Sequence, residues 1–264
     1  MTDQCPHELL RTINRRRACL QAIVAEPQEK RELVETVSTP RSTLDAIVRE
    51  LEQAELVEYR DGVWRATVTG RSAAELYAEC MESLESIHTA GTLLSTLDDP
   101  PSIPPAVLDG AETFESTDPV PDAVIVEFLD RIAEANHVRG VAPRALSGYT
   151  DRVFLRAIEA DSTLEFVLAE RVLSQLSSLD PETVADRLDH EALTVYTAPV
   201  SIEFGFWIAG VPEHLGMIVY ADRGIEGILI NDSADAVEWG ENRYESIRQQ
   251  ASPVSPQRVR TNQL

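Results

Sequence analysis

Lysine is almost absent from this chain of 264 residues: Lys30 is the only one, and every other cationic side chain is an arginine. Against 23 basic residues stand 45 acidic ones, which leaves a formal net charge of −22 at pH 7. Such a surface suits concentrated salt, because there the screening length falls to about 3 Å and carboxylates repel one another weakly. We expect a halophilic protein. An acidic mesophilic protein is the alternative, although such proteins usually keep many lysines.

Cysteines and long apolar runs are scarce as well. Cys5, Cys19 and Cys80 are too few and too scattered for a disulfide framework or a zinc site, and the five histidines lie at unrelated spacings. No apolar run approaches the roughly 18 residues that cross a bilayer, and the N-terminus MTDQCPHELL lacks the basic start and apolar core of a signal peptide. We therefore expect a cytoplasmic protein that binds no metal and no membrane.

The motifs of common enzyme classes are also missing. The chain has no Gly-x-Ser-x-Gly elbow, no Walker loop, no Gly-x-Gly-x-x-Gly fingerprint and no His-Glu-x-x-His. We therefore expect neither enzymatic activity nor a cofactor. A phosphodiester hydrolase with an unfamiliar site is one alternative, and convergent His, Asp or Arg side chains in a deep cleft would favour it.

The acidity is distributed unevenly along the chain. Residues 1–70 hold 10 basic and 12 acidic side chains, a net charge of −2, whereas residues 71–264 carry a net charge of −20. This asymmetry is typical of a protein whose first quarter approaches a polyanion while the remainder does not.

The order of elements in the first quarter predicts a winged helix. Apolar spacing and turn residues predict three helices and then two short strands joined by Asp61-Gly62, the dipeptide that favours a type I′ hairpin. The expected helices cover Leu9–Val24, Lys30–Val37 and Arg41–Ala54, and the expected strands cover residues 56–60 and 63–68.

The third of these helices has the residues of a DNA-recognition helix. Such a helix presents short or hydrogen-bonding side chains to the major groove from its N-terminal end. Asp45 repels phosphate but can accept from a cytosine amino group, so we expect it to discriminate between bases. The candidate DNA-binding residues on and around the helix, on the hairpin and on the first helix are Arg41, Ser42, Thr43, Asp45, Arg49, Arg60, Arg65 and Arg16. Winged helices also dock proteins, so an interaction module without DNA binding is the alternative.

A long helical pattern follows from about Arg71 to Leu97. Its apolar residues recur at spacings of three and four and form one stripe. The stripe predicts a two-fold contact and hence a homodimer; the alternative is that it packs on its own chain. The stripe consists of Ala73, Leu76, Cys80, Leu84, Ile87, Gly91 and Leu94.

Beyond the proline-rich DDPPSIPP, strands and helices first alternate and later strands predominate. This pattern predicts an α/β domain with a mixed sheet, parallel in its early part and antiparallel in its late part. The fold class is therefore α+β or α/β: a winged helix-turn-helix, a connecting helix and a mixed-sheet effector domain. The expected boundaries are 1–70 for the DNA-binding domain, 71–98 for the connecting helix, 99–106 for the linker, 107–251 for the effector or sensor domain and 252–264 for a flexible tail.

Ligands of α/β sheets lie beyond the carboxyl ends of the strands, which indicates APRALSGYTDR and LAERV as the ligand-binding loops. Arginine and tyrosine there suit a small polar or anionic effector, although surface ion pairs are the commoner use of such residues. The candidate ligand-binding residues are Arg144, Ser147, Tyr149, Arg152, Glu170 and Tyr196, with Arg171, Tyr220 and Asp222 nearby.

Residues 30–70 resemble the winged helix of the MarR/ArsR-type superfamily through Ser42-Thr43, Leu51-Glu52, Leu56-Val57 and Thr69-Gly70. With the proline-rich break and the C-terminal VEWGENRYESIRQQA, the whole chain resembles archaeal, especially haloarchaeal, winged-helix regulators of the methanogenesis-regulator type. That resemblance implies a sequence-specific transcriptional regulator of double-stranded DNA with a C-terminal ligand-sensing domain.

Two departures from these families matter. Glu55 stands where glycine usually follows the recognition helix, so the backbone there must avoid the left-handed conformation or carry modest strain. The C-terminal domain resembles a phospholipase-D-like sheet, but that superfamily needs a histidine two residues before a lysine. Since the only lysine is Lys30, this chemistry is excluded.

Overall fold

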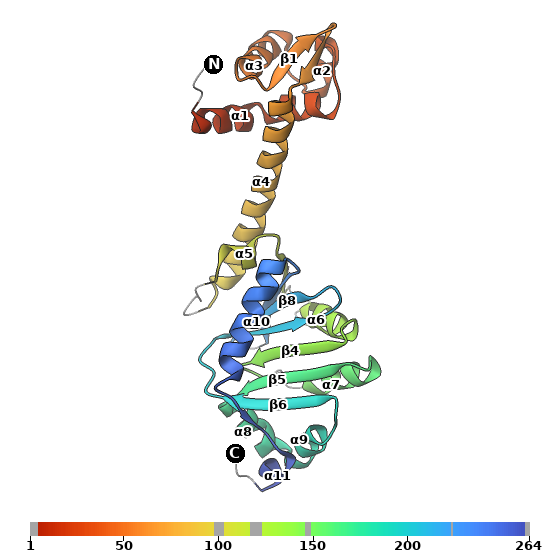
Figure 1. Cartoon of the computed structure of the whole chain (residues 1–264), viewed down its shortest axis with the longest axis vertical. Coiled ribbons are helices and arrows are strands. Elements are labelled where there is room, and N and C mark those ends of the chain that lie inside the picture. Colours follow the sequence, from red (N-terminus) through yellow and green to blue (C-terminus); the bar gives the residue numbers. More distant parts are fainter. Residues whose placement is uncertain (1–4, 98–102, 117–122, 146–148, 223, 262–264) are drawn as a thin grey trace. The chain divides into compact units, whose positions relative to one another are not determined.

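The computed structural model of the chain describes residues 5–97, 103–116, 123–145, 149–222 and 224–261. The chain divides into two compact units, residues 1–83 and 84–264 (Figure 1). Within the described residues, no helix is both long enough and apolar enough to cross a bilayer.

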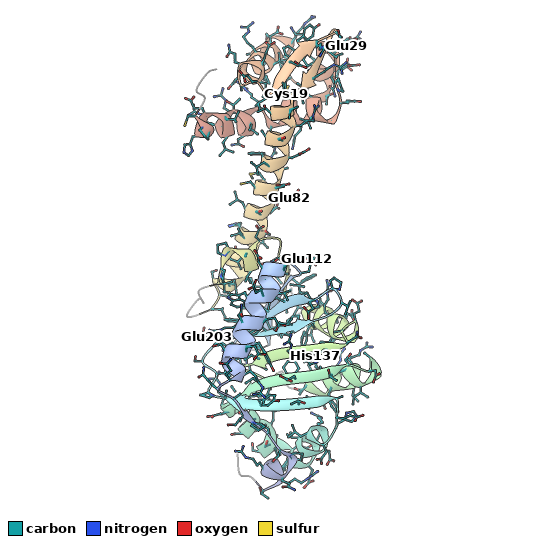
Figure 2. The ribbon with its side chains drawn as sticks, in the orientation of Figure 1. Cys19, Glu29, Glu82, Glu112, His137 and Glu203 are labelled. Atoms are coloured by element: carbon teal, nitrogen blue, oxygen red, sulfur yellow. The ribbon has the colours of Figure 1, made fainter. Side chains whose placement is uncertain are left out.

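The first unit consists of three helices, a hairpin and the start of a long fourth helix. The elements are α1 (Pro6–Ala25), α2 (Lys30–Thr36), α3 (Arg41–Gln53), β1 (Val57–Arg60), β2 (Val63–Ala66) and α4 (Val68–Leu94). One apolar cluster joins them, and Cys19 lies buried within it (Figure 2). Burial raises the pKa of the Cys19 thiol to about 11, so the thiol stays protonated at neutral pH.

The hairpin and the strand that supports it complete the winged helix. Asp61 and Gly62 have φ values of 54° and 83°, as a type I′ turn requires, and Arg60 pairs with Val63 across it. Gln28 adds a one-residue third strand, because its backbone exchanges hydrogen bonds of 3.1 and 2.8 Å with Trp64. The predicted order of helix, helix, helix and wing is therefore confirmed.

The recognition helix α3 ends in a Schellman motif built without glycine. The amide of Leu56 donates to the Leu51 carbonyl at 3.0 Å, and that of Glu55 donates to Glu52 at 2.9 Å. Glu55 has a φ of 56°, so of the two outcomes expected at this position the left-handed one is found. Leu51 and Leu56 are both fully buried, and their apolar contact offsets the strain of a left-handed glutamate.

Helix α4 begins earlier than the sequence predicts. Its first residue is Val68, because the Thr67 hydroxyl accepts from the Gly70 amide at 2.9 Å and so caps the first turn. The predicted boundary between residues 70 and 71 therefore falls inside the helix. A Cβ at Gly70 would lie 1.9 Å from the Leu56 carbonyl oxygen, so the first turn of α4 packs directly on the chain leaving α3.

Two glycines of α4 should respond in opposite directions to alanine. We expect Gly70→Ala to lower the melting temperature of the first unit, since the added Cβ overlaps backbone that a side-chain rotation cannot move. Gly91→Ala meets nothing within 4 Å, so it should stabilise by about 0.5–1 kcal/mol through helix propensity alone. Thermal and urea denaturation followed by circular dichroism measure both. Equal effects of the two substitutions would contradict the close approach.

The second unit is built on an eight-stranded mixed sheet with the order β10-β6-β5-β4-β7-β8-β9-β3. Its strands are β3 (Glu112–Glu115), β4 (His137–Ala142), β5 (Thr163–Ala169), β6 (Leu193–Ala198), β7 (Phe204–Ala209), β8 (His214–Tyr220), β9 (Ile225–Asn231) and β10 (Ser252–Pro253). Strands β4, β5 and β6 are parallel, and all other neighbours are antiparallel. The prediction of a parallel early part and an antiparallel late part is confirmed.

Helices cover both faces of this sheet. They are α5 (Pro105–Leu108), α6 (Ala123–Ala133), α7 (Thr150–Glu159), α8 (Glu170–Leu179), α9 (Pro181–Leu188), α10 (Ala234–Arg248) and α11 (Pro256–Arg260). One apolar cluster joins α10, α5 and the end of α4 to the first face, and a second joins α6 and α7 to the opposite face. Figure 1 shows α10 crossing one face with α6 and α7 on the other.

The face under α10 contains an ion pair, a hydrogen bond and a contact between an arginine and an aromatic ring. Arg139 pairs with Glu241 of α10, and the Tyr244 hydroxyl donates to Glu165 of β5 at 2.5 Å. The Arg248 guanidinium lies 3.2 Å from the centre of the Tyr196 ring. Burial and the hydrogen bond to Glu165 raise the pKa of Tyr244, so its hydroxyl stays protonated and keeps donating.

Two predicted boundaries in this unit are wrong. Residues 252–264 were expected to be a flexible tail, but β10 pairs with the edge strand β6, and Arg260 bonds Asp186 and Asp189 of the α9 region at 2.9 and 3.0 Å. Residues 99–102 of the predicted linker 99–106 lie outside the described residues, and Pro105 already starts α5, because proline suits a first helical turn.

Candidate nucleic-acid interface and ligand cavity

Helix α3 buries one side and exposes the other. Leu44, Ile47, Val48 and Leu51 form its buried side. On the opposite side Arg41, Ser42, Thr43 and Arg49 are exposed. The three arginines at positions 41, 49 and 65 form no ion pair with any described residue, so their guanidinium groups remain available to a ligand.

The N-terminal end of α3 is open to an anion. Pro40 is its N-cap and offers no side-chain acceptor, so no side chain of the described residues caps the first turn. Amides at a helix N-terminus carry a partial positive charge that suits a phosphate oxygen. Together with the exposed hydroxyls of Ser42 and Thr43, this end of the helix can form short contacts with a nucleic-acid backbone.

Two candidate DNA-binding residues are engaged within the unit instead. Asp45 forms an ion pair with Lys30, which holds the start of α2 to α3, so the expected role of this carboxylate as a base discriminator is not supported by its placement. Arg16 donates to Glu50 at 2.7 Å and joins α1 to α3. Sequence spacing could not reveal either pair, since the partners lie 15 and 34 positions apart.

The wing carries the remaining candidates on one hairpin. Arg60 stands at the end of β1, 3.8 Å from Asp61, and is largely exposed. Arg65 is exposed on β2. At that distance and exposure the pair of Arg60 and Asp61 is weak, so a phosphate can displace it.

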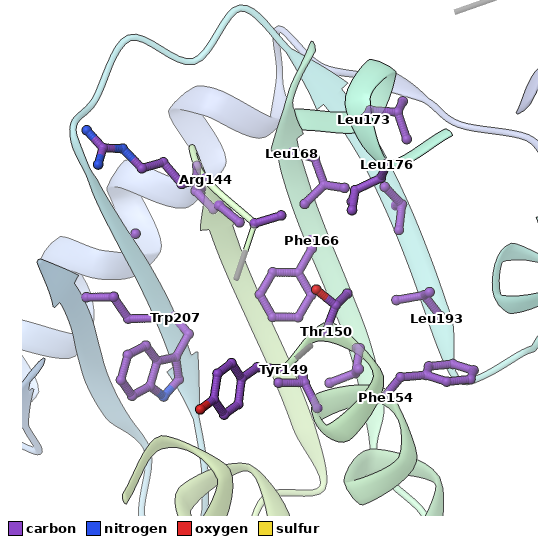
Figure 3. Close-up of a pocket in the computed structure, with 18 of the residues that line it drawn as sticks. Arg144, Tyr149, Thr150, Phe154, Phe166, Leu168, Leu173, Leu176, Leu193 and Trp207 are labelled. Carbon is purple, nitrogen blue, oxygen red and sulfur yellow. The ribbon is translucent and has the colours of Figure 1, made fainter. Parts of the chain in front are cut away.

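The second unit contains an apolar cavity of about 170 Å³. It lies between the sheet and helices α6 to α9 (Figure 3). Seven aromatic residues contribute to its lining, together with leucines from two helices, α8 and α9, and two strands, β5 and β6. The aromatic residues are Phe128, Tyr149, Phe154, Phe166, Phe206, Trp207 and Tyr220.

Glycines in the sheet let three of these rings lie across neighbouring strands. A Cβ at Gly216 would meet the Trp207 ring at 2.0 Å, and a Cβ at Gly140 would meet the Phe166 ring at 2.6 Å. Likewise a Cβ at Gly205 would lie 2.6 Å from the Tyr220 hydroxyl. These three rings therefore lie close against the sheet, where they form the aromatic floor of the cavity.

The cavity contains two of the predicted ligand-binding residues. Arg144 and Tyr149 line it, whereas Arg152 stacks on Tyr149 at 5.4 Å and does not line it. Glu170 is exposed at the start of α8, and Ser147 lies outside the described residues.

Tyr196 corrects the prediction most clearly, because it faces α10 on the opposite side of the sheet. Side chains alternate along a strand, so its neighbour Val195 lines the cavity instead. The apolar lining also departs from the expected polar or anionic effector. Among the described residues, no group of three or more His, Cys, Asp or Glu side chains could hold a metal ion.

A buried histidine positions one ring of the cavity floor. Trp207 Nε1 donates to His214 Nε2 at 3.3 Å, so that nitrogen must be unprotonated. Burial lowers the pKa of His214 and nearby Arg131 lowers it further, while the Pro212 carbonyl and two acidic side chains, Asp232 and Glu134, oppose the shift. The imidazole is therefore neutral and acts as the acceptor for the indole.

We expect His214 to make stability depend on pH. Its pKa is lower in the folded than in the unfolded chain, so the unfolded chain binds more protons as the pH falls below about 6.5, and the free energy of unfolding decreases there. His214→Gln keeps an acceptor for Trp207 but cannot titrate. The substitution should therefore reduce the dependence of the free energy of unfolding on pH. His88→Gln, at an exposed position of α4, is the control. Urea titrations from pH 7.5 to 5 measure the free energy of unfolding of each variant. If this free energy changed equally with pH in the wild type and in His214→Gln, the assignment of a neutral, buried His214 would be wrong.

The fold defines a class of protein in which a winged helix-turn-helix unit is followed by a mixed-sheet α/β unit. Residues 121–250 match the family described as methanogenesis regulatory protein FilR1, middle domain. Residues 7–89 match the HVO_A0261 N-terminal domain family. The expected similarity to regulators of the methanogenesis type is thus confirmed for the second unit, while the MarR/ArsR assignment stays a prediction.

Solved structures give weaker likenesses. TrmBL2, described as an archaeal chromatin protein with a novel mode of DNA binding, has 13% identity over 95% of this chain and 100% of its own, with a TM-score of 0.43. Nuc of Salmonella typhimurium, a phospholipase D family member, has 11% identity over 55% of this chain and 98% of its own, also at 0.43. Scores this low carry no argument about function. The search of curated proteins gives no match.

Proposed function

We propose that this chain is a transcriptional regulator whose first unit reads duplex DNA and whose second unit responds to a ligand or mediates assembly. One observation carries the proposal: Arg41, Ser42, Thr43 and Arg49 stand together on the exposed side of α3, in a complete winged helix. The similarity of the second unit to a domain of a regulatory protein supports it.

The charge distribution is compatible with DNA binding in concentrated salt. Residues 1–70 are nearly neutral, and two of their carboxylates, Glu50 and Asp45, are paired with Arg16 and Lys30. In molar salt the field of the acidic residues beyond them is screened within about 3 Å, whereas groove contacts act at touching distance. Specificity then depends on base contacts and DNA shape, with less help from counterion release.

Substitutions on α3 test the interface directly. The double variant Arg41→Ala/Arg49→Ala should weaken binding to the duplex upstream of the gene for this chain. The loss should be about 1–3 kcal/mol for each arginine that forms a bidentate base contact, and less for one that contacts phosphate. Fluorescence anisotropy in concentrated KCl measures the affinity.

The matched control is Arg31→Ala, since Arg31 is an exposed arginine of α2 that pairs with Glu35 of its own helix. We expect it to leave the affinity within about twofold. If the double variant binds as the wild type does, α3 is not the reading helix.

We also propose that α4 joins two copies of the chain. Leu76 is 67% exposed and Leu84 is 54% exposed, and with Cys80 they recur every four residues along one side of the helix. Ala73 and Leu94 of the predicted stripe pack into the apolar clusters of the two units, so the proposed seam is the middle of the stripe, including the half-buried Ile87. Two reading heads on adjacent half-sites would raise both affinity and specificity.

Leu76→Glu/Leu84→Glu should convert a dimer into a folded monomer, because each carboxylate would lie desolvated at the seam. Light scattering at tens of micromolar in molar KCl measures the mass, and circular dichroism verifies folding. Glu82→Ala is the control, since Glu82 is exposed on α4 and its helical spacing places it on another side of the helix from Leu76 and Leu84. A monomeric wild-type protein would end the proposal.

We propose no catalytic role for the apolar cavity of the second unit. Most of its lining residues are apolar, and the described lining includes no histidine and no carboxylate that could transfer a proton. A metal-independent phosphodiester hydrolase would need such groups in one cleft, so a binding function fits the cavity better.

A further inference from the structure

The interior strand β5 carries two large apolar side chains that are only partly buried. Phe166 and Leu168 lie on it between the flanking strands β4 and β6, where a covered sheet would normally enclose them. Both line the cavity, together with the half-buried Leu193 of the next strand. In Figure 3 the Phe166 ring lies at the centre of the lining, with Tyr149 and Thr150 beside it. The helices above the sheet therefore leave this part of the apolar surface uncovered.

The charged residues of the lining already have partners. Arg187 of α9 forms an ion pair with Asp151 of α7. Arg144 donates to the Ala221 carbonyl at 3.1 Å and lies 5.6 Å from the centre of the Tyr220 ring. A charged ligand would lose its hydration on entering and would have to break one of these contacts to gain a partner.

The polar tip of Tyr220 is engaged as well. Its hydroxyl donates to the Arg144 carbonyl at 3.4 Å, and burial raises its pKa, so it carries no charge toward the cavity. The lining that remains for a ligand is mostly aromatic and aliphatic surface. Dispersion and the hydrophobic effect favour binding of an uncharged ligand that fills such a space. In an empty cavity the lining side chains have no atoms to contact on one side.

We propose that this cavity is the ligand site of the second unit, and that it takes an uncharged apolar molecule about the size of one aromatic ring. A dry apolar cavity of about 150 Å³ is known to accept benzene, which sets the scale for the 170 Å³ found here. The inference rests on the proposed function for calling that ligand an effector. It replaces the polar or anionic effector that the sequence predicts.

Toluene and benzoate are matched probes, because they share one ring and differ in charge. In isothermal titration calorimetry of the full chain in molar KCl, toluene should bind with saturation and benzoate should not. Toluene should also raise the melting temperature, since a ligand that binds only the folded chain stabilises it. Binding of benzoate without toluene would overturn the assignment.

Two leucines of α8 locate the site. Leu176 lines the cavity, whereas Leu179 is 72% exposed and does not. Leu176→Trp should fill the space and weaken toluene binding at least tenfold, and Leu179→Trp should leave it within twofold. Leu168→Phe is a second filling variant for the case in which the first does not fold, as judged by circular dichroism.

Unchanged toluene affinity in the folded filling variants would overturn the proposal. The calorimetry needs no DNA, so its outcome is separate from that of the proposed function. Duplex binding by the wild-type chain, measured without toluene, tests the regulator on its own.

Discussion

Every residue of strands β7 and β8 is buried, so both faces of the sheet must be covered at its centre. This two-sided burial requires helices on each side, because an exposed apolar face would remain in contact with water. Helix α10 covers one face, and α6 and α7 cover the other. The two faces are otherwise unlike: the first holds ion pairs and stacked rings over an apolar core, and the second holds the cavity.

Close approach between rings and backbone shapes the cavity face. Trp207 can lie across the sheet only because position 216 is a glycine. In that position the indole N–H of Trp207 donates a hydrogen bond to His214. The same histidine must stay neutral to accept that bond, which links the protonation state of one buried group to the shape of the aromatic floor. The chemistry of the cavity is thus set by residues that do not themselves line it.

Arginine in place of lysine has structural consequences on the opposite face. A planar guanidinium can stack on a ring and donate to a carboxylate at once, which a compact ammonium does less well. Arg248 lies over Tyr196, and Arg139 lies 5.9 Å from the centre of the Tyr244 ring while it pairs with Glu241. The single lysine, Lys30, instead forms a simple ion pair with Asp45 between α2 and α3.

Local sequence determined the elements of this protein, because their signals act over a few residues. Apolar spacing predicted α3, Asp61-Gly62 predicted the turn of the wing, and the pattern beyond the proline-rich break predicted the mixed sheet of the second unit. Long-range pairing was decided only in the folded chain. It depends on which segments meet, and it set the partners of Asp45 and Arg16, the face on which Tyr196 lies and the docking of β10 against β6. A strand's side chains alternate between faces, and the sequence does not say which face holds a cavity. The apolar character of the candidate ligand site therefore emerged from the packing of α6 to α9 on the sheet.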